Sequence, residues 1–308
     1  INIDFIALLL YNNNMFQYTK NNHIKCSFSS GILNLEHGKC NSHKSWREEC
    51  KSVAQELYDL HGNKLVVTLS GGLDSEVVLH SFIANGIIPK VVILRYERNL
   101  NLHDINYALR ICAARQISPK IVDVNVSEFF RTDLLNYANI TKCSSPQLNL
   151  LINSIDNIDG IPVIGAGENY LSRKEGKKEV YDLEEAKIAA IYKFYENKQR
   201  EIIPAFFQYT PELMISYLQK ESMYRWVETA KQQKYINSKK IKPSIIAEDF
   251  DIEPRGKLTG FELIDELERH QRSVLTNENL GDDGEQWTNF EDYIKEFGVD
   301  LLRDINYV

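Results

Sequence analysis

The sequence predicts an α/β protein built on a parallel sheet with helices on both faces, together with a short N-terminal β segment and a helical C-terminal region. Between residues 63 and 170, apolar strand patterns alternate with helical patterns. These strands are continuously apolar, which is typical of strands buried on both faces. The preceding part reads as short strands and one helix, and the chain after residue 180 is mostly helical. We therefore expect three parts, at 1–62, 63–180 and 181–308.

Each part can be divided into elements. The first contains four strand-like stretches, IDFIALLL, MFQYT, HIKCSF and GILNLEHG, followed by a helix over 42–61 with Ser42 as its cap and Gly62 as its stop. The second contains the strands KLVVTL, KVVILRY, KIVDVNV and GIPVIGAG, with helices expected over 75–85, 102–116, 127–139 and 146–157. The third contains helical patterns over 182–199, 211–231 and 258–272, and an amphipathic one near 288–297.

Composition excludes several classes of function. The 308 residues carry a net charge of −7, which disfavours a general binder of nucleic acids. The five cysteines include no CxxC pair, so we expect neither a disulfide framework nor a zinc site, and a reducing, cytoplasmic location is favoured. The apolar start, INIDFIALLL, is interrupted by Asp4 and lacks a preceding basic region, so it is read as a strand. No apolar run reaches the ~18 residues that a membrane span needs.

The most informative stretch is VVTLSGGLDSEVVLHSF, in which SGGLDS joins the first strand of the sheet to a helix. In open parallel sheets, ligands bind at the carboxyl ends of the strands. Gly71 and Gly72 lack a Cβ, so their amides can converge on an anion, and the helix N-terminus also favours phosphate. Ser70 and Ser75 add hydroxyl donors. Asp74 would be repelled by phosphate unless Mg²⁺ lies between them.

This hexapeptide resembles the PP-loop, SGGxDS, of the N-type ATP pyrophosphatase superfamily, and it is not the GxxxxGK[ST] loop because no lysine follows the glycines. The resemblance implies an adenine nucleotide alpha hydrolase-like fold and an enzyme that cleaves ATP between its α and β phosphates, with ATP and Mg²⁺ as cofactors. Leu94, near the carboxyl end of the second strand, is expected to contribute to the nucleotide site.

Two later segments resemble the asparagine-synthetase-like branch of that superfamily. PVIGAGENY places Gly165 and Gly167 where the branch has a second glycine loop, although Glu168 and Asn169 replace its small residue and aspartate. Glu168 is the expected substitute metal contact or catalytic carboxylate. DIEPRGKLTGFE resembles the C-terminal R-x-K-x-G stretch, which implies that Lys257 reaches the α-phosphate and stabilises the transition state. The glutamine amidotransferase half of asparagine synthetase is absent from this sequence.

Other polar segments have ordinary structural explanations beside functional ones. Arg173, Lys174, Lys177 and Lys178 form either a solvated loop or a lid over phosphate or an acidic substrate. Cys143 is either a residue at the start of a helix or a sulfur-transfer thiol. His103 and Asp104 are expected as capping residues at the start of the helix over 102–116.

Three functions remain open. The first is an adenylating enzyme that activates a carboxylate or carbonyl oxygen of a small-molecule or peptide acceptor for attack by an amine or ammonia. The second is a PP-loop enzyme that installs sulfur or nitrogen in a nucleobase or tRNA, which the overall acidity disfavours. The third is a non-catalytic ATP-binding protein. We favour the first, with no membrane partner.

Overall fold

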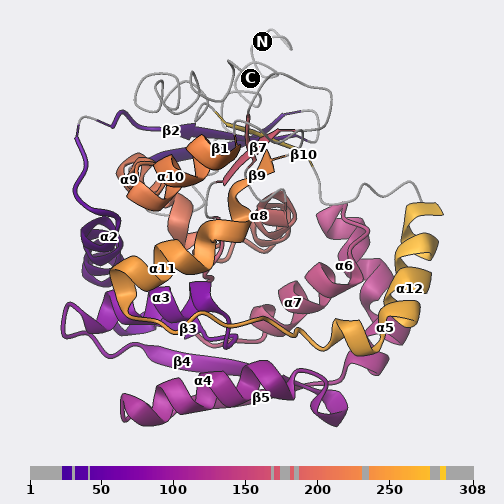
Figure 1. The fold of residues 1–308 in the computed structure, drawn as a ribbon. Coiled ribbons are helices and arrows are strands. Elements are labelled where there is room, and N and C mark those ends of the chain that lie inside the picture. Colours follow the sequence, from indigo (N-terminus) through magenta and orange to yellow (C-terminus); the bar gives the residue numbers. More distant parts are fainter. Residues whose placement is uncertain are drawn as a thin grey trace, which may run out of the picture.

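The computed structural model describes residues 23–29, 32–40, 42–167, 170–173, 181–183, 187–230, 236–277 and 285–288. Its centre is a four-stranded parallel sheet with helices on both faces, as the sequence predicts (Figure 1). The strands lie in the order β5-β4-β3-β6, where they are β3 (Leu65–Thr68), β4 (Lys90–Tyr96), β5 (Lys120–Val124) and β6 (Ile161–Val163).

This strand order determines where a ligand can bind. The chain steps outward from β3 to β4 and β5 and then returns to pair β6 on the other side of β3. A crevice opens at such a reversal, outside the carboxyl ends of the two strands beside it. Thr68 Oγ1 donates to Val163 O at 2.9 Å and joins the ends of β3 and β6 at this point. The turn of residues 70–75 and Gly165 both follow these strand ends directly.

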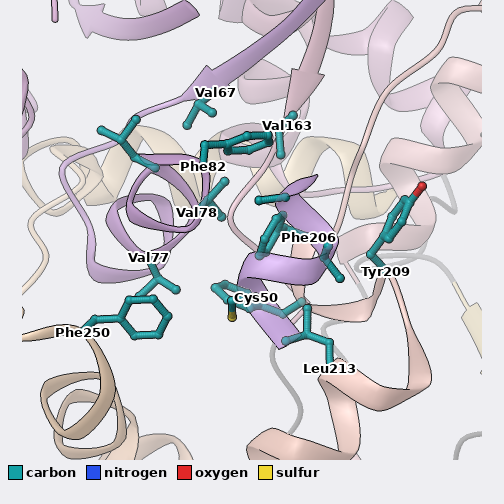
Figure 2. Close-up of a cluster of buried hydrophobic side chains, with 14 of the residues drawn as sticks. Cys50, Val67, Val77, Val78, Phe82, Val163, Phe206, Tyr209, Leu213 and Phe250 are labelled. Atoms are coloured by element: carbon teal, nitrogen blue, oxygen red, sulfur yellow. The ribbon is translucent and has the colours of Figure 1, made fainter. Parts of the chain in front are cut away.

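Helices cover both faces of the sheet. Successive strand residues point to opposite faces, and the residues on both faces are apolar. Leu65 and Val67 of β3 belong to one buried cluster with helices α2, α3, α4, α9 and α11, and Val66 belongs to another with α7 and α8. Figure 2 shows Val78 and Phe82 of α3 beside Val67, Val163 and Phe206 in the first cluster. The helices around the sheet are α2 (Trp46–His61), α3 (Leu73–Ile83), α4 (Leu102–Ala114), α5 (Val126–Thr132), α6 (Leu134–Thr141), α7 (Pro146–Asp156) and α8 (Lys187–Lys198).

The C-terminal region is mainly helical and packs against the sheet domain. Trp46 of α2 contacts Phe207, Tyr217 and Phe250, with ring centroids 5.2–5.9 Å apart. The extended segment after α11 runs past α3 and α7 before it reaches α12 (Figure 1). The longer helices of this region are α9 (Pro211–Leu218), α10 (Glu221–Ala230), α11 (Lys242–Phe250) and α12 (Asp265–Asn277), and short helical turns lie at Phe206–Gln208, Ser238–Ile241 and Phe261–Leu263.

Two small sheets complete the described structure. In the first, β2 lies between β1 and β10, antiparallel to the former and parallel to the latter. In the second, β7 lies between β8 and β9 and pairs antiparallel with both. The strands are β1 (Ile24–Ser29), β2 (Ile32–His37), β7 (Tyr170–Arg173), β8 (Tyr181–Leu183), β9 (Ile236–Asn237) and β10 (Glu285–Thr288).

Several predicted boundaries were wrong. The helix expected over 42–61 begins at Trp46, and Ser45 rather than Ser42 caps it by accepting from Glu48 N. The patterns over 127–139 and 211–231 each form two helices, which break at Asp133 and at 219–220. The pattern over 258–272 begins as irregular chain and a short helical turn at Phe261–Leu263, and its longer helix starts at Asp265. The strands expected within 1–22, most of the helix near 288–297, and residues Lys174, Lys177 and Lys178 lie outside the described residues.

Candidate active site at the carboxyl ends of the strands

A cavity of about 230 Å³ lies at the carboxyl end of the central sheet. Ser70, Asp74 and Ser75 line it from the turn after β3, and Leu94 lines it from β4. Its other walls come from the segment after β6, the start of α7, helix α8 and the segment before α12. The predicted site residues among its lining are Ser70, Asp74, Ser75, Leu94, Gly165 and Lys257.

The two serines of the turn hold its backbone. Ser75 Oγ donates to Gly72 O at 3.0 Å and accepts from Ser70 N at 3.1 Å. Ser70 Oγ accepts from Gly72 N at 3.3 Å. Helix α3 begins here with Gly72 as its N-cap, so its positive end faces the cavity wall that the serines form.

Three of the four predicted glycines, Gly71, Gly165 and Gly167, pack too closely against neighbouring atoms to carry a side chain. Gly71 has φ +83°, and a Cβ there would lie 1.9 Å from the backbone oxygen of Asp104. A Cβ on Gly165 would lie 2.7 Å from Ser75 N, so the segment after β6 packs directly on the start of α3. Gly167, with φ +89°, packs against Ala205 and Gln208 instead of the cavity. Glu168 and Asn169 lie outside the described residues.

Lys257 comes to the turn from a distant part of the chain. A Cβ built on Gly72 would lie 3.6 Å from Lys257 Cδ, so the stem of this lysine covers Gly72. Gly71, which packs against the backbone of Asp104, and Gly72 are both buried, whereas Ser70 is exposed and Asp74 is half-buried. The lysine and the turn, which the sequence suggested on separate grounds, form one wall of the cavity.

Two carboxylates in the first turn of α3 oppose anion binding, and each has a cationic partner. Lys242 Nζ lies 2.7 Å from Asp74 Oδ2. Arg255 Nη2 lies 2.5 Å from Glu76 Oε2, and both side chains are about nine-tenths buried. Acidic side chains at a helix N-terminus weaken its attraction for phosphate. Lys242 and Arg255 offset this negative charge. With Lys257, three cationic side chains lie at the turn.

Asp104 is a site residue whose role the sequence did not reveal. It was expected to cap helix α4, but its Oδ1 accepts from the backbone N–H of Leu258 at 3.0 Å. Burial raises the pKa of this carboxyl group, although the Leu258 amide and Lys257 act in the opposite direction. Asp104 also lines the cavity. It therefore fastens the segment that carries Lys257 beside the turn.

Lys242 and Arg255 were also missed. Lys242 lies 168 residues from Asp74 along the chain, and no local pattern links the two. Arg255 had a signal, because it precedes Lys257 by two residues in the stretch that resembles R-x-K-x-G. The glycine that the structure needs in this stretch is Gly260, one residue beyond that pattern, where φ is +89° and a Cβ would lie 2.5 Å from the carbonyl carbon of Leu100.

One family model matches part of the chain. Residues 64–152, which include the turn, β4 and α4, match the model of the queuosine biosynthesis protein QueC family. We call the turn of residues 70–75 the PP-loop, because its sequence SGGLDS has the SGGxDS pattern. The match covers under a third of the chain, so the QueC family is what these residues are similar to. No curated protein matches the chain.

Solved structures also match. An NMN synthetase from Francisella tularensis is 13% identical, and the alignment covers 74% of this chain and 94% of that one, with a TM-score of 0.32. An NH₃-dependent NAD synthetase from Campylobacter jejuni, in complex with nitrate, is 16% identical, and the alignment covers 76% of this chain and 93% of that one, also with a TM-score of 0.32. No helix among the described residues is both long and apolar enough to traverse a membrane.

His80 of α3 gives the stability of the sheet domain a predictable pH dependence. Burial lowers the pKa of His80 from 6.5 to about 4, and Arg115, Arg47 and Arg255 act in the same direction. Because the folded pKa is depressed, the unfolded chain binds the proton more readily, and stability falls as the pH drops from about 6.5 to 4. We expect His80→Gln to reduce this slope by up to about 1.4 kcal/mol per pH unit in urea denaturation between pH 4 and 7. An unchanged slope would show that His80 is not the group responsible.

Proposed function

We propose that this chain is an ATP-dependent adenylating enzyme that releases AMP and pyrophosphate. The main support for the proposal is that Lys257 packs against the PP-loop at one wall of the cavity. A cation placed where charge develops in a secluded site stabilises a transition state. Phosphoryl and nucleotidyl transfers depend mainly on such positioning and electrostatic stabilisation.

The cavity walls suggest how ATP would be held. Val92 and Leu94 of β4 supply apolar surface of the kind that suits a nucleobase. Ser70, Ser75 and the start of α3 offer hydroxyl and amide donors to the pyrophosphate. Lys257 lines the cavity beside these groups and its stem covers Gly72, so this side chain would have to move before the Gly72 amide could meet a phosphate.

Asp74 is the residue that would hold Mg²⁺ with the phosphates. Mg²⁺ is commonly bound by one or two carboxylates, with phosphate oxygens and water completing its shell, so one aspartate in this position fits. Within the described ranges, no three His, Cys, Asp or Glu side chains are grouped in a way that could hold a metal. When bound, the ion would neutralise charge on the leaving pyrophosphate. Lys242 orients the Asp74 carboxylate.

The reaction proposed here is asparagine-synthetase-like. A carboxylate or carbonyl oxygen of the acceptor attacks the α-phosphorus of ATP, and the bond to pyrophosphate breaks. An amine or ammonia then attacks the activated carbon, and AMP leaves with the oxygen. Lys257 would stabilise charge on the α-phosphate in the first step, and Glu168 remains the predicted carboxylate of the second glycine loop.

The QueC match favours a second candidate, in which the adenylated oxygen belongs to a nucleobase. Nitrogen installation would use the same ATP site. Sulfur transfer through Cys143 has less support, because this side chain is fully buried and Ser145 N lies 3.3 Å from its sulfur at the start of α7. The two candidates differ in acceptor and not in the chemistry of ATP.

A pyrophosphate-release assay tests the proposal. ATP and Mg²⁺ are supplied with panels of carboxylic acids, amines, modified nucleobases and RNA. Asp74→Asn is expected to reduce release by roughly 10²-fold, since the metal loses its protein ligand. Asp123→Asn, at an exposed carboxylate of β5 paired with Arg95, is the matched control and should leave the rate unchanged.

The outcomes separate the candidates. Release that depends on a carboxylic acid and an amine supports the first candidate, and release that depends on a nucleobase or RNA supports the second. ATP binding without release under any condition would leave a non-catalytic ATP-binding protein. Equal activity of Asp74→Asn and wild type would contradict the role given to Asp74.

A further inference from the structure

Arg255 lies at the junction of the PP-loop and the segment that carries Lys257. Its Nε and Nη2 both donate to Gly71 O, at 3.0 and 2.9 Å. Nη2 also reaches Glu76 Oε2, and the guanidinium carbon lies 4.8 Å from the centre of the Tyr107 ring. The side chain is only 8% exposed. A backbone carbonyl, a carboxylate and an aromatic face therefore all contact this one guanidinium group.

The bond to Gly71 O has a consequence for the neighbouring amide. A trans peptide group is planar, so its oxygen and its hydrogen point in opposite directions. By holding Gly71 O, Arg255 fixes the direction of the Gly72 N–H on the other side of that plane. That amide now donates to Ser70 Oγ at 3.3 Å. A glycine pair has no side chains to resist rotation of this peptide, so an outside group must supply the restraint.

The same arginine also restrains Lys257. Arg255 is two residues before the lysine, and Leu258, one residue after it, donates its N–H to Asp104. Lys257 is thereby held from both sides, while Gly260 packs closely against the backbone of Leu100. The segment has no helix or strand over residues 251–259 to define its path. Its position beside the PP-loop depends on these individual contacts.

We propose that Arg255 is a positioning residue that holds the Gly71–Gly72 peptide and Lys257, the two phosphate-binding groups, beside each other before ATP arrives. Its role in turnover rests on the proposed function, whereas its effect on the two segments does not. Lysine cannot replace it, since an ammonium group lacks the planar fork that places two N–H groups on one oxygen.

Hydrogen exchange in the ATP-free protein tests the positioning directly. Arg255→Lys is compared with wild type and with Arg95→Lys, a control that alters an exposed, two-bond arginine–carboxylate pair on β4. We expect amide exchange to become roughly tenfold faster or more in peptides that cover 70–74 and 255–260, and to stay unchanged in β5. If both peptides exchange as in wild type, the proposal is wrong. Should Arg255→Lys fail to fold, Glu76→Gln is measured in its place, with the same expectation at a smaller magnitude.

Steady-state kinetics provide a second test, because a purely structural role for Arg255 would not produce the pattern in kcat and KM described next. Arg255→Ala should lower kcat more than it raises KM for ATP, and added guanidinium ion should restore part of the loss. The double variant Arg255→Ala/Lys257→Ala should have nearly the kcat of Lys257→Ala, because Arg255 acts on kcat through the lysine. Independent, multiplying losses in kcat would overturn the coupling. Changed exchange in a protein that releases no pyrophosphate would leave the positioning intact and refute the enzymatic function.

Discussion

Alanine at position 257 is expected to reduce pyrophosphate release by about 10²- to 10³-fold, which corresponds to about 3–4 kcal/mol of lost transition-state stabilisation. The Lys257 stem lies on Gly72, beside the groups that would bind pyrophosphate. Its charge would therefore act where negative charge develops. The affinity for ATP should change much less, because the metal and the amides of the loop still bind the ground state. Single-turnover release and ATP titration measure the two effects separately.

Lys90→Ala is the matched control for this substitution. Lys90 is an exposed lysine that begins β4, and it therefore lies at the amino edge of the sheet, opposite the cavity. Its removal changes the net charge by the same amount and should leave the rate unaltered. Equal losses in the two variants would indicate a general charge effect. A rate for Lys257→Ala within threefold of wild type would contradict the proposed role.

Gly71→Ala is expected to destabilise the fold by roughly 3 kcal/mol or more. A non-glycine residue in the left-handed region costs about 1–3 kcal/mol, and the new Cβ would also overlap the backbone oxygen of Asp104. The built Cβ lies 1.9 Å from that oxygen, so either α4 or the PP-loop must move. Urea denaturation measures the loss, and a variant that remains folded should bind ATP poorly.

Gly86→Ala separates strain from overlap. Gly86 has a similar φ of +73°, but nothing lies within 4 Å of a Cβ built there. It should cost only the conformational strain, at the lower end of about 1–3 kcal/mol. The difference between the two variants estimates the cost of displacing Asp104. Equal destabilisation would mean that the loop and α4 separate easily.

The sequence predicted the sheet domain well because its signals are local. A buried parallel strand is a short apolar run, and SGGLDS follows such a run in a form that few other turns share. The strands themselves and the expected position of the loop at their carboxyl edge were therefore within reach. The breaks at Asp133 and at 219–220 were not, since apolar periodicity continues across them and tertiary packing decides where each helix ends.

The contacts between the PP-loop and the C-terminal segment were predictable only in part. Lys257 was found through a resemblance, and Arg255 stood two residues away without an assigned role. Their partners, Glu76 and the carbonyl of Gly71, cannot be inferred from spacing, because the pairs are separated by about 180 residues and involve the backbone. Asp104 was misread as a capping residue, because its position in the first turn of a helix is typical of one. Its actual partner, the backbone N–H of Leu258, is also distant in the sequence.

The small sheet formed by β1, β2 and β10 has a consequence for synthesis of the protein. Residues 32–35 pair with residues 285–288, so one edge of β2 receives its neighbour only after nearly all of the described chain has been made. Until then that edge presents unpaired backbone groups to other nascent chains. This sheet therefore cannot be completed until β10 has been synthesised. A chaperone would protect the open edge of β2 during that interval.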